Sequence, residues 1–280
     1  MEAMISYFET MPSEHRGLIL ILGLTFFFLL EQAAPLFELT YKRGKHTLTN
    51  LFFTATTIVV NFAMAAILIE SARWVGANGF GLYHWTPGPW ILKVLVGFLV
   101  LDFIAAWLAH YTEHHVKWMW KFHLIHHTDQ HVDTTTANRH HPGESVIRFV
   151  FTTIGVVIAG APIWMIFAYQ SLSVVLTQFN HSNISMPTWL DNFLVLVFCT
   201  PNMHRVHHHY RQPYSDTNYG NIFSFWDRIF GTYVRVDNNK LVYGVDTHME
   251  HKEATNIGEL LKIPFQKYRP HIQYEKEEKL

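Results

Sequence analysis

Charged residues are distributed unevenly along the chain, so that long apolar segments alternate with short polar connections. Residues 47–69 contain no Asp, Glu, Lys or Arg over 23 positions, and residues 149–190 contain none over 42. A helix needs about 20 apolar residues to cross the hydrocarbon core of a bilayer. The first stretch is therefore long enough for one crossing, and the second is long enough for two.

Two further apolar segments carry isolated charges: residues 17–39 include two glutamates, and residues 90–109 include Asp102 near the middle. Gly160-Ala161-Pro162 lies inside the longest charge-free run and is typical of a turn. Since only helices and closed barrels cross a bilayer, the pattern predicts an all-α integral membrane bundle of about four to five hydrophobic helices. We expect the membrane segments at about residues 17–39, 48–70, 90–109 and 147–190, the last as a helical hairpin.

Basic residues in the connecting loops predict the orientation. Residues 41–46 contain three Lys or Arg, whereas residues 70–89 contain only Arg73. The positive-inside rule then places the first loop in the cytoplasm, and counting the crossings places the chain after the third segment and after the hairpin on the same side. We expect one membrane-embedded domain, in a bacterial plasma membrane or the endoplasmic reticulum. The domain would cover residues 1–280 and carry a cytosolic helical cap formed by residues 110–146 and 200–280.

Composition narrows the class of protein. Hydrophobic residues make up 49% and charged residues 15%, against about 25% charged residues in soluble domains. A net charge of −1 lacks the excess of basic residues with which proteins attract nucleic acid, so we expect no nucleic-acid partner. The single cysteine, Cys199, excludes an intramolecular disulfide and a Cys-rich zinc site. The N-terminus carries acidic residues and lacks the basic region of a cleaved signal peptide, so we expect the first apolar segment to remain as a membrane helix.

Histidines are concentrated in one part of the chain: 14 of the 20 lie between residues 110 and 209. Offsets of three and four place side chains on one face of a helix, and neutral imidazole is a ligand for iron, copper, nickel and zinc. Eight imidazoles exceed what one tetrahedral zinc needs, so we expect two metals. His181, at the end of the hairpin, would be a ninth ligand. Three histidine boxes have the helical spacing: His110 and His114; His123, His126 and His127; His204, His207 and His208.

Simpler explanations exist for single histidines. A lone histidine is usually a core residue, the run at residues 207–209 could be an exposed turn, and two boxes could form a structural zinc site. Three boxes with matching spacing at one membrane surface favour a metal centre instead. For the neighbouring His115, His131, His140 and His209, we expect surface or supporting roles.

The boxes and their flanking residues resemble the fatty acid hydroxylase/sterol desaturase superfamily of membrane-bound di-iron oxygenases. His110 and His114 follow Asp102 and Trp107 as in the helix that leads to that family's first box. The resemblance extends over about residues 98–235. It rests on residues 120–127 (WKFHLIHH), 139–144 (RHHPGE), 180–183 (NHSN), 204–208 (HRVHH), 218–220 (NYG) and 226–232 (WDRIFGT).

The resemblance implies an enzyme with two non-haem irons that uses O2 as co-substrate to hydroxylate or desaturate a C–H bond of a membrane lipid. It implies no catalytic residue beyond the metal centre and no binding site for an organic cofactor. Ligating histidines usually donate their second N–H to a carboxylate or carbonyl, so Asp102 and Glu144 could orient ligands, and His141 could be a further ligand or a supporting residue. Asp102 could instead pair with a neighbouring helix. The implied ligands are His110, His114, His123, His126, His127, His181, His204, His207 and His208.

Several functions stay open on these motifs. The substrate could be a sterol, a fatty acyl chain, a sphingoid base, a carotenoid or an ether lipid, and hydroxylation is not distinguished from desaturation. An alkylglycerol-type monooxygenase that acts on ether lipids is an alternative within the superfamily. A transporter or non-catalytic protein that binds metal is the alternative outside it. The sequence contains no nucleotide-binding fingerprint, haem segment or Cys cluster, so we expect an external electron donor such as cytochrome b5, a ferredoxin or a reductase.

Overall fold

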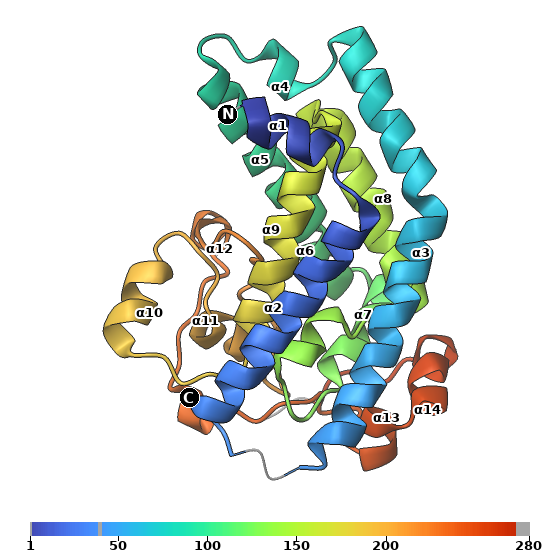
Figure 1. Ribbon diagram of the computed structural model, residues 1–280. Coiled ribbons are helices and arrows are strands. Elements are labelled where there is room, and N and C mark those ends of the chain that lie inside the picture. The colour runs from blue at the N-terminus through green and yellow to red at the C-terminus, as the bar shows by residue number, and fades with distance from the viewer. Residues whose placement is uncertain (1, 39–40, 273–280) are drawn as a thin grey trace.

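The computed structural model describes residues 2–38 and 41–272, and these residues form an all-α structure (Figure 1). Long helices run side by side along one direction, and short helices and loops gather at one end of them. The long helices are α2 (Ser13–Ala33), α3 (Arg43–Asn78), α5 (Trp90–Asp102), α8 (Pro142–Ala159) and α9 (Ile163–His181).

Shorter elements connect and cover the long helices. The π-helical turn η1 (Phe103–Leu108) joins α5 to α6, and η2 to η5 are 3₁₀ turns at Thr134–Asn138, Tyr214–Asp216, Asn238–Lys240 and Ile263–Phe265. The short α-helices are α1 (Glu2–Glu9), α4 (Leu82–Trp85), α6 (Ala109–His115), α7 (Lys117–His127), α10 (Thr188–Leu194), α11 (Pro201–His207), α12 (Phe225–Ile229), α13 (His251–Thr255) and α14 (Ile257–Lys262).

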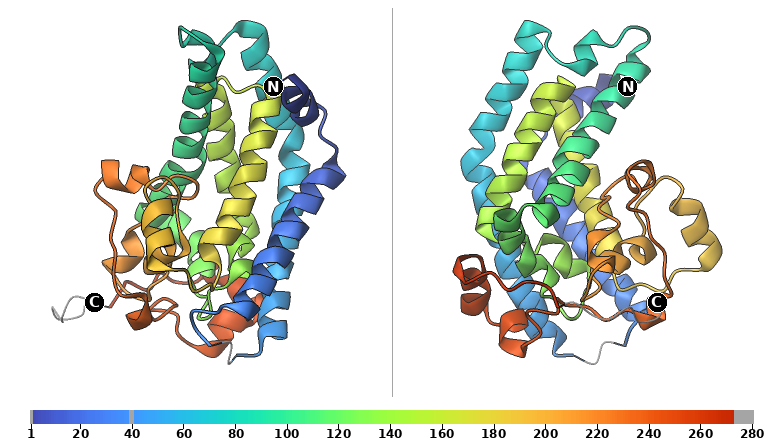
Figure 2. Two further views of the ribbon diagram at one scale, coloured as in Figure 1. Left: turned by 60° about the vertical axis from the view of Figure 1, so that its left-hand side comes forward. Right: turned by 180° about the vertical axis from the view of Figure 1, so that it is seen from behind.

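Among the described residues, four helical segments are long and apolar enough to cross a membrane. α9 returns beside them, antiparallel to α8 (Figure 2). The fold class expected from the sequence, an all-α bundle with four to five hydrophobic helices, is therefore confirmed. The four segments are Ser13–Ala33, Arg43–Trp85, Trp90–His115 and Pro142–Ala159.

The helix bounds differ from the predicted segments in ways that have local causes. α2, which matches the first predicted membrane segment, ends at Ala33, because Pro35 closely follows and cannot continue the helix. The predicted end, residue 39, lies outside the described residues. α3 contains 36 residues, which is about 54 Å at the helical rise and exceeds the hydrocarbon thickness. α3 is therefore longer than one crossing needs, and His46 and Asn50 in its first turns are buried against other polar residues.

The predicted hairpin turn is present at Gly160-Ala161-Pro162. Gly160 adopts φ 68°, the left-handed conformation that favours glycine, and a Cβ atom there would lie 2.4 Å from the carbonyl oxygen of Phe80. The apolar core of the bundle packs α3, α5, α8 and α9 together around Leu101, Val156 and Met165. This core holds the long helices in register, so that the ends of α6 and α9 and the start of α8 meet at the same end of the bundle (Figure 1).

Candidate metal centre

Nine histidines converge at that end of the bundle in two adjacent clusters of buried or nearly buried side chains. Within each cluster, one ligand atom from every residue lies within 4.8 Å of the others. The nine are the same residues that the sequence singled out. The first cluster contains His110, His114, His123, His127 and His207, and the second contains His126, His181, His204 and His208.

Neighbouring residues of one box are divided between the clusters. In α7, His123 and His127 belong to the first cluster and His126 belongs to the second. In α11, His207 belongs to the first cluster, whereas His204 and the following His208 belong to the second. Successive helical residues point about 100° apart, so one helix end between the clusters supplies both. The ring centroids of His127 and His208 lie 4.8 Å apart across the boundary.

The imidazole nitrogens approach one another at the spacing of metal ligands. The Nε2 atoms of His110 and His123 lie 3.1 Å apart, and those of His114 and His127 lie 3.2 Å apart. In the second cluster, His181 Nε2 lies 3.1 Å from the Nε2 atoms of both His126 and His204. Two nitrogens bound at right angles to a metal, at about 2.1 Å each, would be about 3.0 Å apart.

Hydrogen bonds at the other ring nitrogen assign the tautomers. His110 Nδ1 lies 2.9 Å from the Tyr219 carbonyl oxygen, and His207 Nδ1 lies 2.7 Å from the Thr217 carbonyl oxygen. A carbonyl only accepts, so each Nδ1 carries the proton and each Nε2 carries a lone pair. His181 Nδ1 donates in the same way to the Thr177 carbonyl oxygen at 2.8 Å.

Carboxylates fix the tautomers of two more imidazoles. Glu144 Oε1 accepts from His123 Nδ1 at 2.7 Å, and Asp216 Oδ1 accepts from His114 Nδ1 at 3.0 Å. His110 and His123 both carry the proton on Nδ1, so their Nε2 lone pairs face each other at 3.1 Å, which is unfavourable unless a cation lies between them. Buried carboxylate–histidine pairs of this kind orient metal ligands and increase their basicity.

Unpartnered buried nitrogen atoms also indicate that the histidines bind a metal. Among the described residues, His207 Nε2 and both ring nitrogens of His208 are buried without a hydrogen-bond partner, a costly state for polar atoms in a folded protein. Burial lowers the pKa of His126, His207 and His208 well below the usual range. The imidazoles are therefore neutral, which is the form that binds metal. The donor set fits two iron ions.

Glu144 belongs to a buried group of charges beside the first cluster. Besides His123, it accepts from His140 Nδ1 at 2.7 Å and from Arg148 Nε at 3.0 Å. Arg148 also pairs with the buried Glu113 at 2.7 Å. The sequence indicated Glu144 but missed Glu113, which lies between two box histidines without a motif of its own.

Two other candidates lie in neither cluster. His141 caps the N-terminus of α8, where its Nδ1 accepts from the Gly143 backbone N–H at 2.9 Å. Asp102 is fully buried and accepts from Trp226 Nε1 at 2.9 Å, which matches pairing with a neighbouring element rather than orientation of a ligand. The π-helical turn after Asp102 shifts the direction of the following side chains, and turns of this type often mark functional sites.

The loop after η3 carries the carbonyl groups that orient His110 and His207. Asp227 Oδ1 accepts from the Tyr219 N–H at 2.9 Å, and its Oδ2 accepts from the Gly220 N–H at 2.8 Å. Trp107 Nε1 donates to the same carboxylate at 3.1 Å. Asp227 therefore holds this loop under the first cluster. The sequence marked Tyr219 only as part of residues 218–220 and did not indicate the role of its carbonyl group or of that of Thr217, because every residue has the same backbone atoms.

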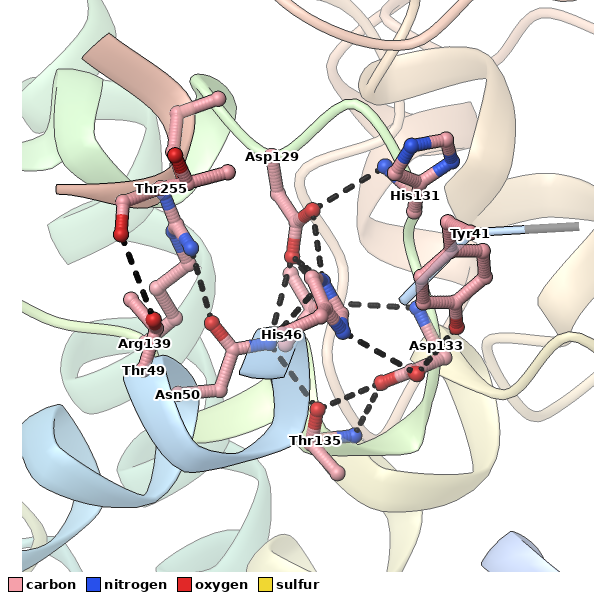
Figure 3. A network of polar contacts seen from close by, with 12 residues as sticks. Tyr41, His46, Thr49, Asn50, Asp129, His131, Asp133, Thr135, Arg139 and Thr255 are labelled. Atoms are coloured by element: carbon pink, nitrogen blue, oxygen red, sulfur yellow. Dashed lines mark hydrogen bonds and ion pairs between the residues drawn. The ribbon is translucent and has the colours of Figure 1, made fainter. Parts of the chain in front are cut away.

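A second buried polar region, the Asn50 network, lies beside the C-terminus of α7 (Figure 3). Arg139 donates to the Ile125 carbonyl oxygen at 2.9 Å and to Asn50 Oδ1 at 2.8 Å. Asn50 Nδ2 in turn donates to Thr135 Oγ1 at 2.9 Å, and Asp129 accepts from His46 Nε2 at 2.8 Å. We define the network as His46, Asn50, Asp129, Asp133, Thr135 and Arg139.

Comparison with known proteins supports these observations. The fatty acid hydroxylase family model matches residues 94–232, about half of the chain. The chain is 25% identical over 214 residues to the ornithine lipid hydroxylase OlsE of Rhizobium tropici, which covers 73% of this chain and 62% of that protein. It is 31% identical over 199 residues to the alkylglycerol monooxygenase of Homo sapiens, which covers 69% of this chain and 39% of that protein.

A very-long-chain aldehyde decarbonylase, GL1-11 of Oryza sativa, is 28% identical over 178 residues, which cover 62% of this chain and 64% of that protein. The chain therefore spans less than two thirds of the length of each of these relatives. No solved structure gives a significant match. With its histidine clusters and candidate membrane-spanning helices, this chain belongs to the fatty acid hydroxylase family, a family of lipid hydroxylases and monooxygenases.

Proposed function

We propose that this protein is a membrane-bound di-iron oxygenase that hydroxylates a C–H bond of a lipid chain. The observation that carries the proposal is the pair of adjacent clusters, five and four histidines, whose Nε2 atoms approach one another at the spacing of metal ligands. One lipid C–H group, O2, two electrons and two protons would yield one alcohol and one water molecule. Two irons bound by the clusters would supply the activation of O2.

The chain's own residues would hold the irons and keep the site dry. All nine histidines would be ligands, the first cluster for one iron and the second for the other. Glu144 and Asp216 would fix the tautomers of His123 and His114. Full burial of His123 and His207 would exclude bulk water, which strengthens the electrostatic interactions inside the site.

For the substrate, we propose the alkyl or acyl chain of a lipid with a polar headgroup. Two of the relatives are named as hydroxylase or monooxygenase, one of ornithine lipid and one of alkylglycerol, which favours hydroxylation over desaturation. An ether-lipid monooxygenase is the second candidate, because the alkylglycerol monooxygenases are the more similar in identity. Hydroxylation beside an ether oxygen would produce a hemiacetal that breaks down into an aldehyde and an alcohol.

The two electrons would come from a separate donor, a cytochrome b5, a ferredoxin or a reductase, since the 280 residues contain no signature of a second redox group. We also propose that the metal end of the bundle faces the cytoplasm, on the basis of the basic residues at positions 41–46. Labelling of Lys240→Cys, at the exposed turn η4, in sealed and in opened membrane vesicles tests this orientation. Labelling of cells from the outside would contradict it.

The test of function begins with iron analysis of protein purified without oxygen in detergent. We expect about two irons per chain. The iron-loaded protein would then receive a lipid extract, a chemical reductant and ¹⁸O2, and mass spectrometry would search for one ¹⁸O atom in a lipid alcohol. A labelled aldehyde would favour the ether-lipid candidate. One zinc per chain that iron cannot replace, with no labelled product, would contradict the proposal and favour a structural metal site.

A further inference from the structure

The segment between α9 and α11 exposes an apolar surface that none of the four candidate membrane spans includes. On α10 and the residues after it, Trp189 is 71% exposed, Phe193 is 67% exposed and Leu196 is 64% exposed. Ile229, at the end of α12, is 63% exposed. We define the apolar ridge by these exposed side chains: Trp189, Phe193, Leu196, Val197, Ile229 and Phe230.

The first part of the ridge has no exposed charged residue of its own, although the side chain of Arg235, which pairs with Asp191, is 42% exposed. Between residues 188 and 198 the only charged residue is Asp191. Its carboxylate is buried, pairs with Arg235 and accepts from Thr200 Oγ1 at 2.6 Å. A contiguous exposed surface of large apolar side chains is unusual where a protein faces water, and it marks contact with protein or membrane.

The two parts of the ridge form one unit that is attached to a membrane span. The backbone N–H of Ser224 donates to the Val197 carbonyl oxygen at 3.0 Å, which joins the segment of α10 to that of α12. The ring of Phe230 stacks on Trp107 with centroids 4.4 Å apart and on Phe103 with centroids 5.4 Å apart. Both partners lie in the span Trp90–His115, so the ridge continues the apolar surface of that span.

The views of the whole structure agree with this continuity. α10 and α12 lie beside the long helices, level with the middle of the structure, rather than beyond the end of the bundle (Figures 1 and 2). The outer faces of α2 and α3 are themselves lined with exposed apolar side chains. The ridge therefore projects sideways at a level where neighbouring helices also expose apolar groups.

We propose that the apolar ridge is immersed in the acyl chains of the bilayer that the four spans cross, and that it enters from one leaflet without crossing. Continuity with the apolar surface of the span favours lipid over a protein partner. Immersion would place α11, which begins at Pro201 directly after the ridge, at the edge of the bilayer. If the proposed function holds, a lipid chain would reach the second cluster from there.

The experiment measures what surrounds a nitroxide label at Phe193→Cys. The full-length protein would be reconstituted in phosphatidylcholine nanodiscs, with the buried Cys199 replaced by alanine. Collision rates with O2, which concentrates in lipid, and with chromium oxalate, which stays in water, would be compared by electron paramagnetic resonance. Leu22→Cys, exposed on the span α2, is the lipid control, and Lys240→Cys is the water control.

We expect the ratio of the O2 to the chromium oxalate collision rate at Phe193→Cys to match Leu22→Cys and to exceed Lys240→Cys several-fold. A ratio equal to that of Lys240→Cys would overturn the proposal. Low collision rates with both reagents would also overturn it, since they would show that protein covers the ridge. Leu196→Cys provides a second position should the first variant not fold. Neither iron nor activity enters this test, so its outcome is separate from that of the proposed function.

Discussion

The two histidine clusters and the Asn50 network are both buried and both polar, yet their polar atoms differ in how they are satisfied. In the first cluster, the Nε2 lone pairs of His110 and His123 face each other at 3.1 Å, and in the second both ring nitrogens of His208 lack a hydrogen-bond partner among the described residues. In the network, Asn50 uses its oxygen for Arg139 and its nitrogen for Thr135. Buried polar groups are normally paired, so the clusters point to a ligand and the network points to a structural role.

The largest effect is expected when a ligand is removed. His207→Ala should lower turnover by more than about 100-fold, the upper end of what loss of a supporting residue costs, and should reduce the iron content of the first cluster. The measurements are iron per chain and product formation. His115→Ala, at an exposed histidine of the same region, is the matched control and should retain both. Normal turnover in His207→Ala would contradict its assignment as a ligand.

A smaller loss is expected for a residue that acts on the metal only through a histidine. Asp216→Ala removes the acceptor of His114 Nδ1, and the affinity for iron should fall by about 10–100-fold. Asp216→Asn keeps an acceptor oxygen and should recover most of the affinity. Titration of apo-protein with Fe²⁺ measures both. Equal losses in the two variants would show that the charge, not the hydrogen bond, matters.

The Asn50 network should respond in stability rather than in metal binding. Asn50→Leu removes the acceptor of Arg139 Nη1 and the donor to Thr135 Oγ1, although both residues keep other buried partners. The free energy of unfolding should fall by about 1–3 kcal/mol for the unpaired Nη1 group. Iron per folded chain should stay the same. Asn61→Leu makes the same chemical change at an exposed position of α3 and should have little effect. A loss of iron without a loss of stability in Asn50→Leu would contradict the structural role of the network.

The smallest effect is expected at Asp102, which the structure places with Trp226 instead of with a histidine. Asp102→Asn retains an oxygen that accepts from Trp226 Nε1, so the change in stability should remain within about 1 kcal/mol. Iron content and the Fe²⁺ affinity should match the wild type. A drop in affinity like that of Asp216→Ala would restore Asp102 as a residue that orients a ligand.

Sequence reasoning identified the nine histidines because helical offsets and the flanking residues are local features. It did not indicate how they are divided. His126 and His127 are adjacent in the chain, yet they join different clusters, and this depends on how α7 is rotated between α6, α9 and α11. Residues 191–199 also fell between the predicted membrane hairpin and the predicted cap, since a short apolar stretch with one aspartate matches neither pattern.

The sequence by itself determined the all-α class, the number of apolar helices within one and the nine histidines that cluster, because charge depletion and helical periodicity are properties of consecutive positions. Only the tertiary structure decided the rest. Glu144 accepts a hydrogen bond from a box histidine, whereas Asp102 accepts one from Trp226. The backbone carbonyl groups of Thr217 and Tyr219 accept from two further box histidines. Such choices depend on distances between residues far apart in the chain, which packing alone sets.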